Sequence, residues 1–493
     1  MGKEVSTARY TREQRRDFRR KVRRGLDVFE LMLAHHHFEA ERPMTGLEIE
    51  LNLIDAEGEP SFDNAEVLEA IGDRDYQTEL ARYNIELNSP PRPLGGDSAL
   101  RREEELRASL NRAEETAKRQ GSHICCIGTL PTLRPEHFNG DWISEGRRYE
   151  ALNDSIFNAR GEDIELDIEG PTGERLRMWA DSIAPESACT SVQLHLQVSP
   201  GDFAAYWNAA QAVSGPQLGV GANSPFLFGK RLHAETRIEL FKQATDTRPV
   251  ELRNQGVRPR VFFGERWVTS IFDLFEENTI YFPSLLAEIS DEDPLAVLEA
   301  GGTPTLAEMC LHNGTIYRWN RPIYDVVDGR PHLRVENRVL PAGPTIIDTM
   351  ANAAFYYGLV RTLATSDRPI WSRLSFSAAA QNFATCARDG LAAEVYWPGF
   401  GELSVDELVL RHLLPQAALG LESWGVSQDV IDRYLTIIEQ RCLTGLTGAE
   451  WQVATVERFE RAGMAREEGL RRMLARYVEG MHSNEPVHTW SIP

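Results

Sequence analysis

Residues 45–54, which read TGLEIELNLI, constrain the fold of this chain more than any other stretch. Side chains alternate between the two faces of a β-strand, so Glu48 and Glu50 share one face while the apolar residues beside them share the other. Two like charges side by side on a strand cost stability. The stretch therefore predicts a strand whose apolar face meets the core and whose acidic face meets a cation.

Three other stretches repeat this placement of ligating groups on the polar face of a predicted strand. They are Glu86 in NIELNSPP, with Glu79 seven residues earlier, His195 beside Gln193 in SVQLHLQV, and Glu336 beside Arg338 in LRVENRV. Oxygen ligands with an occasional imidazole suit Mg²⁺ or Mn²⁺, and carboxylates near arginines fit ATP phosphates held through metal ions. A single glutamate on a strand is usually solvated, and a single histidine is usually structural. The interpretation therefore requires the four strands to be neighbours in one sheet.

The sequence lacks the common signatures of other catalytic sites. It contains no GxxxxGK[ST] phosphate loop, no GxSxG nucleophile elbow and no HExxH zinc motif. The GVG at residues 219–221 lacks the third glycine and the trailing acid of a dinucleotide-binding turn. The carboxylates on predicted strands thus remain the main candidates for chemistry.

The charge balance argues against a nucleic-acid partner. The 493 residues carry 53 Lys and Arg against 74 Asp and Glu, a formal net charge of −21, whereas phosphate neutralisation needs a basic surface. The arginine-rich residues 11–25 are a local exception. Phe18, Val22 and Leu26 recur there at helical spacing, which favours a helix docked through an apolar stripe with its arginines in solvent.

No membrane partner and no exported state are expected either. No apolar run is long enough to span a bilayer, and no signal peptide opens the sequence. The six cysteines show neither CxxC pairs nor disulfide-like spacing. These features predict a cytoplasmic protein with reduced thiols.

Periodicity predicts a mixture of strands and helices. Helices are expected at 64–71, at 100–121 with Gly121 as the stop, and near 202–213, where a Gly/Pro-rich segment follows. Residues 162–180 predict a hairpin with an acidic row, which we interpret as a solvated face paired with Arg175 and Arg177 rather than as a cation site. After residue 400 the pattern is almost entirely helical. An α+β protein built around a mostly antiparallel sheet is expected.

Six stretches stand in one order along residues 45–350: GLEIELNLI, IELNSPPR, CTSVQLHLQV, ANSPFLFGKR with TRIELF, GTIYRWNRP and HLRVENRVLPAGPTIID. Together they resemble the glutamate–cysteine ligase type 2 (carboxylate–amine ligase) family of the glutamine synthetase superfamily. The resemblance implies a curved sheet that forms a funnel-shaped active site flanked by helices. The arginine-rich start and the helical pattern after residue 400 lie outside these stretches. Three regions are therefore expected: an N-terminal arginine-rich helical segment (1–40), a glutamine-synthetase-like catalytic domain (41–400) and a helical C-terminal region (401–493).

The resemblance also implies roles for individual residues. Matched position by position, the metal ligands are Glu48, Glu50, Glu79, Glu86, His195 and Glu336. Arg338 would contact the transferred phosphoryl group, Arg237 a phosphate or a substrate carboxylate, and Arg321 the nucleotide. The implied cofactors are ATP and Mg²⁺, with Mn²⁺ as an alternative ion. The implied partners are small-molecule substrates, and a homo-oligomer is left open.

The implied reaction is amide formation. ATP phosphorylates a carboxylate, usually the γ-carboxylate of glutamate, and an amine attacks the acyl phosphate. Two stretches depart from the family pattern, LHAET before Arg237 and NRVLPAGP around Arg338, and they leave the identity of the amine open. Two alternatives also stay open: a metal-dependent phosphotransferase of the same superfamily, and a non-catalytic nucleotide-binding regulator whose helical C-terminal region binds a partner.

Overall fold

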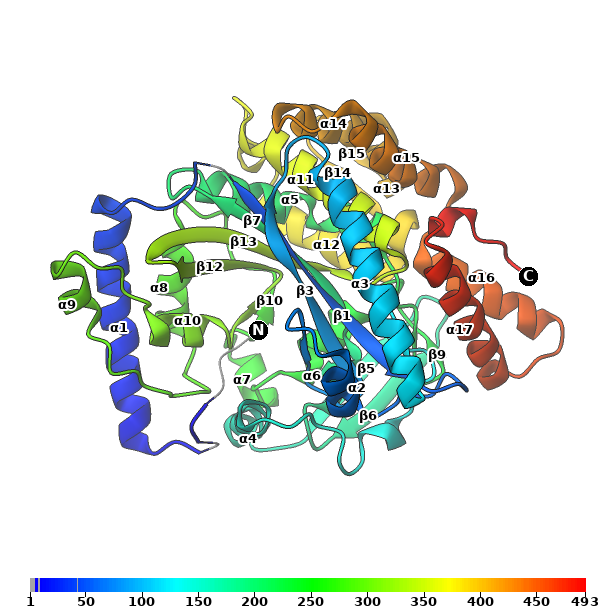
Figure 1. Ribbon diagram of the computed structural model, residues 1–493, viewed down its shortest axis with the longest axis horizontal. Coiled ribbons are helices and arrows are strands. Elements are labelled where there is room, and N and C mark those ends of the chain that lie inside the picture. The colour runs from blue at the N-terminus through cyan, green and yellow to red at the C-terminus, as the bar shows by residue number, and fades with distance from the viewer. Residues whose placement is uncertain (1–4, 8, 42) are drawn as a thin grey trace.

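A curled sheet of antiparallel strands forms the centre of the protein (Figure 1). The structure is a computed structural model that describes residues 5–7, 9–41 and 43–493. Its seven-stranded sheet has the order β12-β13-β7-β1-β3-β2, and β4 pairs with the far end of β1. The strands are β1 Met44–Ile54, β2 Tyr76–Thr78, β3 Asn84–Pro93, β4 His123–Cys125, β7 Ser191–Val198, β12 Asn320–Val327 and β13 Arg330–Pro341. The predicted α+β class with a curved, mostly antiparallel sheet is confirmed.

Strand β1 has the two faces that its sequence predicts. Leu47, Ile49, Leu51 and Leu53 are at most 2% exposed and join the main core, because the sheet is covered by helices on that side. Glu48 and Glu50 lie half-buried on the other face. The four strands that carry the predicted ligands, β3, β1, β7 and β13, are consecutive neighbours in the sheet. The condition on which the sequence interpretation depended is therefore met.

Helices surround the sheet, and two long ones lie against its apolar face. These two are α5 Phe203–Gly221 and α11 Ile346–Ala364, and α3 Ser98–Gln120 packs along β3 and β4. The other helices are α1 Arg12–His35, α2 Asn64–Ile71, α4 Arg147–Arg160, α6 Thr236–Ala244, α7 Val250–Asn254, α8 Ile271–Tyr281, α9 Pro294–Glu299, α10 Ala307–Asn313, α12 Phe376–Asp389, α13 Val405–Leu408, α14 Leu414–Ser423, α15 Gln428–Thr444, α16 Gly448–Arg461 and α17 Arg466–Ser483. No helix in the described part of the chain combines the length and apolar character needed to cross a bilayer.

Helix α5 is longer than the sequence predicts. The Gly/Pro-rich residues after 213 continue the helix through Pro216 to Gly221. Gly215 makes this possible at the contact with α12, since a Cβ there would lie 2.9 Å from the carbonyl carbon of Asn382. Nearly every residue of α5 is buried, so tertiary packing outweighs the weak helix propensity of proline and glycine.

Short two-stranded sheets lie outside the central sheet. They pair β5 Ile164–Glu169 with β6 Arg175–Ala180, β8 Phe226–Leu227 with β9 Lys230–Arg231, β10 Val261–Phe262 with β11 Tyr317–Arg318, and β14 Glu394–Trp397 with β15 Gly401–Ser404. The β5–β6 pair is the hairpin predicted at 162–180. Arg177 donates to Glu165 at 2.8 Å and Arg175 donates to Asp167 at 2.6 Å, so the acidic row is paired in solvent as expected.

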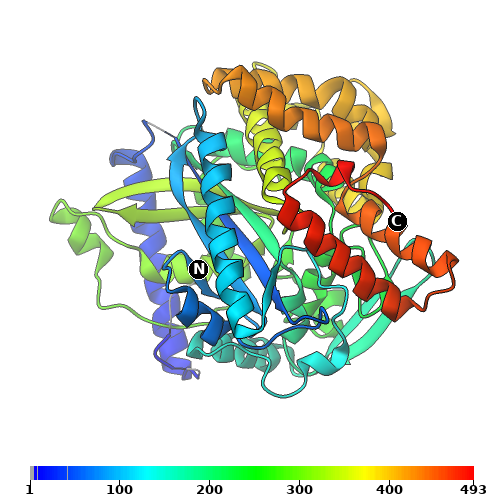
Figure 2. The same ribbon diagram turned by 45° about the vertical axis from the view of Figure 1, so that its right-hand side comes forward.

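Helix α1 lies on one side of the molecule, and α16 and α17 lie on the other (Figure 1). Helix α1 begins with a capping box between Thr11 and Gln14 and buries Phe18, Val22 and Leu26, which confirms the predicted apolar stripe. Helices α16 and α17 pack beside each other at the C-terminal end (Figure 2). Residues of both helices share a buried cluster with β4 and β5, so the C-terminal region contacts the predicted catalytic domain closely.

Candidate active site

The polar face of the central sheet forms the floor of a cavity of about 380 Å³. Helices α4 and α10 and the short 3-10 helix η2 (Ala184–Ala188) supply walls on the opposite side. All six residues predicted as metal ligands line this cavity: Glu48, Glu50, Glu79, Glu86, His195 and Glu336. Residues from widely separated parts of the sequence therefore meet at one place, and they form two groups.

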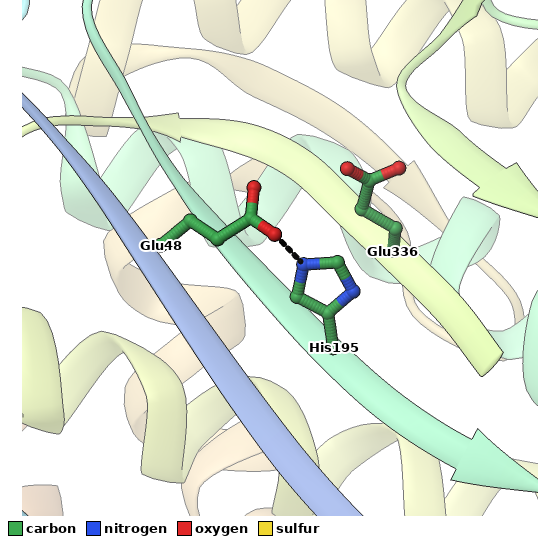
Figure 3. Close-up of side chains that lie close together, drawn as sticks. All are labelled: Glu48, His195 and Glu336. Carbon is green, nitrogen blue, oxygen red and sulfur yellow. Dashed lines mark ion pairs between the residues drawn. The ribbon is translucent and has the colours of Figure 1, made fainter. Parts of the chain in front are cut away.

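The first group consists of Glu48 of β1, His195 of β7 and Glu336 of β13 (Figure 3). One ligand atom from each residue lies within 4.8 Å of the other two, and Nε2 of His195 is 3.0 Å from Oε1 of Glu48. The register places His195 opposite Glu336 on one side and opposite Gly46 on the other. Because a Cβ at Gly46 would lie only 3.3 Å from that of His195, glycine leaves room for the imidazole ring.

The second group consists of Glu50 of β1, Glu86 of β3 and Glu79 from the loop after β2. Their ligand atoms also lie within 4.8 Å of one another. Glu50 stands directly opposite Glu86 in the β1–β3 register, the arrangement in which like charges destabilise a sheet most. The spacing of Glu48 and Glu50 along one strand places one of them in each group.

Charge is balanced in the first group. Burial raises the pKa of Glu48, but the adjacent ring of His195 outweighs burial and lowers the pKa to about 2. Burial likewise opposes ionisation of Glu336, yet the guanidinium groups of Arg321 and Arg338 hold its pKa well below the ordinary value. These carboxylates are therefore ionised at neutral pH, as ligands of a cation must be.

Charge is not balanced in the second group. Burial, together with the charges of Glu48 and Glu50, raises the pKa of Glu86 to about 7. Burial and the carboxylates of Glu86 and Glu50 raise the pKa of Glu79 well above its ordinary value. Three carboxylates this close cannot all stay ionised without a compensating positive charge.

The donor set fits divalent cations. It offers carboxylate oxygens and one imidazole nitrogen, which suit Mg²⁺ and Mn²⁺. The Nε2 atom of His195 is buried and makes no well-aligned hydrogen bond within the described residues, although Glu48 lies 3.0 Å away. A cation bound by both residues would take the place of this close contact. The role of the six residues as ligands nonetheless rests on this fit and stays a prediction.

Two of the three predicted arginines lie in the cavity. Arg338 donates to Glu336 at 3.0 Å and also to Gln193, and its side chain faces the cavity between the two carboxylate groups. Arg321, directly opposite Glu336 in the β12–β13 register, grips the same carboxylate with Nη2 at 2.8 Å and with Nε. Glu336 is therefore fixed from both sides.

The third predicted arginine lies outside the cavity, and its contact with phosphate or substrate stays a prediction. Arg237, near the start of α6, is 2% exposed and does not line the cavity. Its Nε donates to Glu235 at 3.0 Å, and its Nη2 donates to the carbonyl oxygen of Val339 on β13. In this structure the Arg237 side chain therefore contacts β13 and does not line the cavity.

Some residues that line the cavity were not predicted from the sequence. Arg334 precedes Glu336 by two and shares its face, so the alternation of β13 could have identified it. Its Nε donates to Nδ1 of His195 at 3.1 Å, and its Nη1 donates to Asp325 at 3.0 Å. Glu186 also lines the cavity, but it belongs to η2, where no periodic pattern marks it.

The sequence matches the profile of one protein family. The sequence profile of the family described as Glutamate-cysteine ligase family 2 matches residues 44–476. A search of curated protein sequences gives no match.

Solved structures show the same fold at low identity. The glutamate–cysteine ligase of Francisella tularensis, solved in complex with AMP, aligns with a TM-score of 0.56 and 11% identity over 92% of this chain and 91% of that one. A bifunctional glutathione synthetase from Pasteurella multocida aligns with a TM-score of 0.50 and 12% identity over 92% of this chain and 54% of that one. At such identities the likeness concerns the fold alone.

Proposed function

Because the chain belongs to glutamate-cysteine ligase family 2, whose profile covers most of its length, we propose that it is an ATP-dependent carboxylate–amine ligase that works through an acyl phosphate. The observation that carries this proposal is the convergence of two groups of ligands and two arginines on one cavity. Glu48, His195 and Glu336 would hold one divalent cation. Glu50, Glu79 and Glu86 would hold another.

The reaction brings two anions together, the triphosphate of ATP and the carboxylate of the acid substrate. Bound Mg²⁺ would supply the positive charge that neutralises both and relieves repulsion among the glutamates. All of the predicted ligands except Glu79 stand on adjacent strands of one sheet, an arrangement that would hold them in place during the reaction. Exclusion of water during the reaction would protect an acyl phosphate from hydrolysis.

Arg338 is the residue placed to bind the transferred phosphoryl group. Its planar guanidinium can grip two phosphate oxygens at once, and it stays charged because the carboxylates of Glu336 and Glu50 outweigh burial and raise its pKa further. Arg321 and Arg338 hold Glu336 between them and so orient that carboxylate toward the cavity. Arg321 thus acts on the nucleotide site through Glu336.

Part of the cavity lining is apolar, which supports a site for the base of ATP. Apolar side chains from α8, α10 and β12 contribute to it, among them Phe275, Leu311, Ile323 and Val326. A purine base could pack its flat apolar faces against such side chains. The phosphates would then extend over the two carboxylate groups.

The proposed reaction has two steps. A carboxylate oxygen of the acid attacks the γ-phosphorus of ATP, and ADP leaves. The nitrogen of the amine then attacks the acyl carbon and loses a proton, and inorganic phosphate leaves. We propose glutamate as the acid and an amino acid such as cysteine as the amine, on the basis of the family and not of any group in the cavity that would recognise a thiol.

The test is a screen of ATP consumption over pairs of acids and amines, with mass spectrometry of the product. We expect phosphate release that requires both substrates, a new amide, and loss of turnover in Glu336→Gln. Glu165→Gln, on the exposed hairpin, serves as the matched control. A stable phosphorylated product without amine dependence would instead assign a phosphotransferase, and nucleotide binding without turnover would assign a regulator.

A further inference from the structure

A buried tyrosine lies behind the first group of predicted ligands, on the apolar face of the sheet. Tyr357 of α11 is 2% exposed and does not line the cavity. Its hydroxyl donates to two backbone carbonyl oxygens, that of His195 at 3.1 Å and that of Gly46 at 3.3 Å, which share its one hydrogen. Burial raises the pKa of this hydroxyl, against the nearby guanidinium of Arg102, so the hydroxyl keeps its proton at neutral pH. One side chain therefore contacts both β1 and β7.

The strand pairing is irregular at this contact. The register between β1 and β3 shifts by one residue between Thr45 and Leu47. Gly46 therefore opposes two residues of β3, Pro90 and Pro91, which is the arrangement of a β-bulge. Proline has no N–H, so neither residue can donate a ladder hydrogen bond to β1 here. The ladder between β1 and β3 is thus interrupted beside the carbonyl that the tyrosine hydroxyl contacts.

Side chains from two helices hold the interrupted segment from behind. Arg102 of α3 is 5% exposed, and its Nη2 donates to the carbonyl oxygen of Thr45 at 2.8 Å. The hydroxyl of Tyr357 makes the corresponding contact at the next residue, Gly46. Loss of either contact would leave a buried donor short of a partner, which is costly. These contacts therefore fix the backbone of β1 at the bulge.

The fixed segment adjoins two ligands of the first group. Gly46 precedes Glu48 by two residues on the same face of β1 and stands opposite His195 in the β1–β7 register. In the structure Nε2 of His195 lies 3.0 Å from Oε1 of Glu48. A shift of either backbone would change the separation of these two side chains. A contact that joins the two backbones therefore governs that separation without touching either side chain.

We propose that Tyr357 is a positioning residue for the first group: its hydroxyl holds β1 and β7 together and keeps Glu48 and His195 at the separation that one cation requires. The inference rests on the proposed ligase function, which places a divalent cation between these side chains. It adds a residue from outside the cavity, on a helix that carries none of the predicted ligands. The second group consists of carboxylates from β1, β3 and the loop after β2, so it should depend on this hydroxyl far less.

The preceding residue offers a matched control. Tyr356 is also buried in α11, and its hydroxyl makes no hydrogen bond to any residue that the structure describes. Tyr356→Phe and Tyr357→Phe each remove one buried hydroxyl and keep the aromatic ring with its packing. Only the second substitution removes a contact with the sheet. The difference between the two variants therefore separates this contact from the general effect of a substitution in the core.

Mn²⁺ is the probe, since it suits the same ligands as Mg²⁺ and its unpaired electrons detect a coordinated nitrogen. The first group contains the imidazole of His195 and the second contains carboxylates alone, so nitrogen coupling in pulsed electron paramagnetic resonance identifies the first. We expect Tyr357→Phe to weaken Mn²⁺ binding at the nitrogen-coupled site about tenfold, the effect typical of a residue that orients a ligand. Binding at the other site should change far less, and Tyr356→Phe should match the wild type at both. Urea unfolding checks that each variant is folded under these conditions.

Three results would overturn the inference: unchanged affinity of the nitrogen-coupled site in Tyr357→Phe, an equal loss in Tyr356→Phe, or an equal loss at both sites. Wild-type protein that binds Mn²⁺ without nitrogen coupling would overturn it as well, because His195 would then not be a ligand. The ligase proposal fails by a different result, namely intact Mn²⁺ binding without any amine-dependent release of phosphate. The two failures are therefore distinguishable.

Discussion

At Arg338 one side chain contacts a predicted metal ligand and also carries the proposed contact with phosphate. It contacts Glu336 and Gln193 on the floor of the cavity while its outer edge faces the space above the two carboxylate groups. We predict that Arg338→Lys lowers kcat by about a hundredfold, because an ammonium cannot grip two phosphate oxygens in one plane.

The affinity for ATP should change far less in this variant, by about threefold or less, since most of the binding comes from contacts away from the transferred group. Steady-state kinetics and nucleotide titration measure the two effects separately. A variant that loses ATP affinity but keeps the wild-type kcat at saturation would contradict the role given to Arg338.

Glu86 allows a test of the second carboxylate group through stability. Its pKa of about 7 lies above the ordinary value of 4.5, so in metal-free protein the stability linked to this group is complete below pH 4.5 and declines as the pH rises through 7. We predict that Glu86→Gln raises the Tm in EDTA at pH 8, because it removes one of three crowded carboxylates.

Mg²⁺ should raise the Tm of the wild-type protein at pH 8, because it binds the folded state and neutralises the carboxylates. The increase should be smaller in Glu86→Gln, and Glu165→Gln should behave like the wild type. Thermal unfolding with and without Mg²⁺ measures both effects. A wild-type Tm that is insensitive to Mg²⁺ would count against a metal site here.

At the scale of elements, Glu114 connects α3 to two other segments. Its carboxylate accepts from the backbone N–H of Ile124 at 2.7 Å and lies 3.0 Å from His123 of β4 and 3.4 Å from His482 of α17. Burial raises its pKa, but the nearby rings of His482 and His123 and the N–H of Ile124 outweigh burial and lower the pKa to about 2. This contact stabilises the fold above the ordinary pKa of 4.5, and the contribution is lost as the pH falls toward 2.

We predict that Glu114→Gln lowers the free energy of unfolding by about 1–3 kcal/mol at pH 7. The difference from the wild type should shrink as the pH falls from 4.5 toward 2, because the wild-type carboxyl then becomes protonated. Urea unfolding at pH 7 and at pH 3 measures it. Glu115→Gln, the exposed neighbour, is the matched control, and an equal effect of both substitutions would refute the proposed connection.

Elements with a regular local pattern were predictable from the sequence, and elements fixed by distant contacts were not. The strand at 45–54 and the helix at 64–71 follow from alternation and from helical spacing, and the structure has both. The end of α5 depended on the close approach of α12 at Gly215, which leaves no local signal. The place of Glu186 in a 3-10 turn left none either.

The candidate site was likewise only partly predictable from the sequence. Alternation identified the polar faces of the strands, but only the resemblance to a family suggested that Glu79, from a loop, would join Glu50 and Glu86. The position of Arg237 could not be predicted either, because the start of α6 turns this side chain toward Glu235 and Val339 of β13. Spacing along a chain cannot show which way a helix faces after a loop.

At the scale of the whole molecule, the C-terminal helices are part of the main body. Trp451 and Tyr477 are at most 2% exposed, and the Tyr477 hydroxyl donates to the carbonyl oxygen of Cys126 at 2.8 Å and accepts from Asn223 at 2.7 Å. The sequence predicts a boundary near residue 400 between a catalytic domain and a helical C-terminal region. These contacts allow that boundary to be tested. We predict that a chain ending at residue 447 fails to fold, because it exposes the buried cluster that α16 and α17 cover.

The milder variant Tyr477→Phe removes the hydroxyl alone and should cost about 1–3 kcal/mol, since it leaves the carbonyl of Cys126 and the amide of Asn223 without that partner. Circular dichroism and urea unfolding measure both changes. A shortened chain that unfolds cooperatively at the wild-type Tm would show instead that the C-terminal helices form an independent unit.

The alternation of side chains along β1 limits which insertions and deletions the sequence can accept during evolution. Insertion or deletion of one residue between Leu47 and Leu53 would exchange the two faces for the rest of the strand. Leucine side chains would then point into the cavity, and carboxylates would point into the apolar core. Loops at the rim can vary in length without this penalty. The length of β1 is therefore fixed far more tightly than its composition.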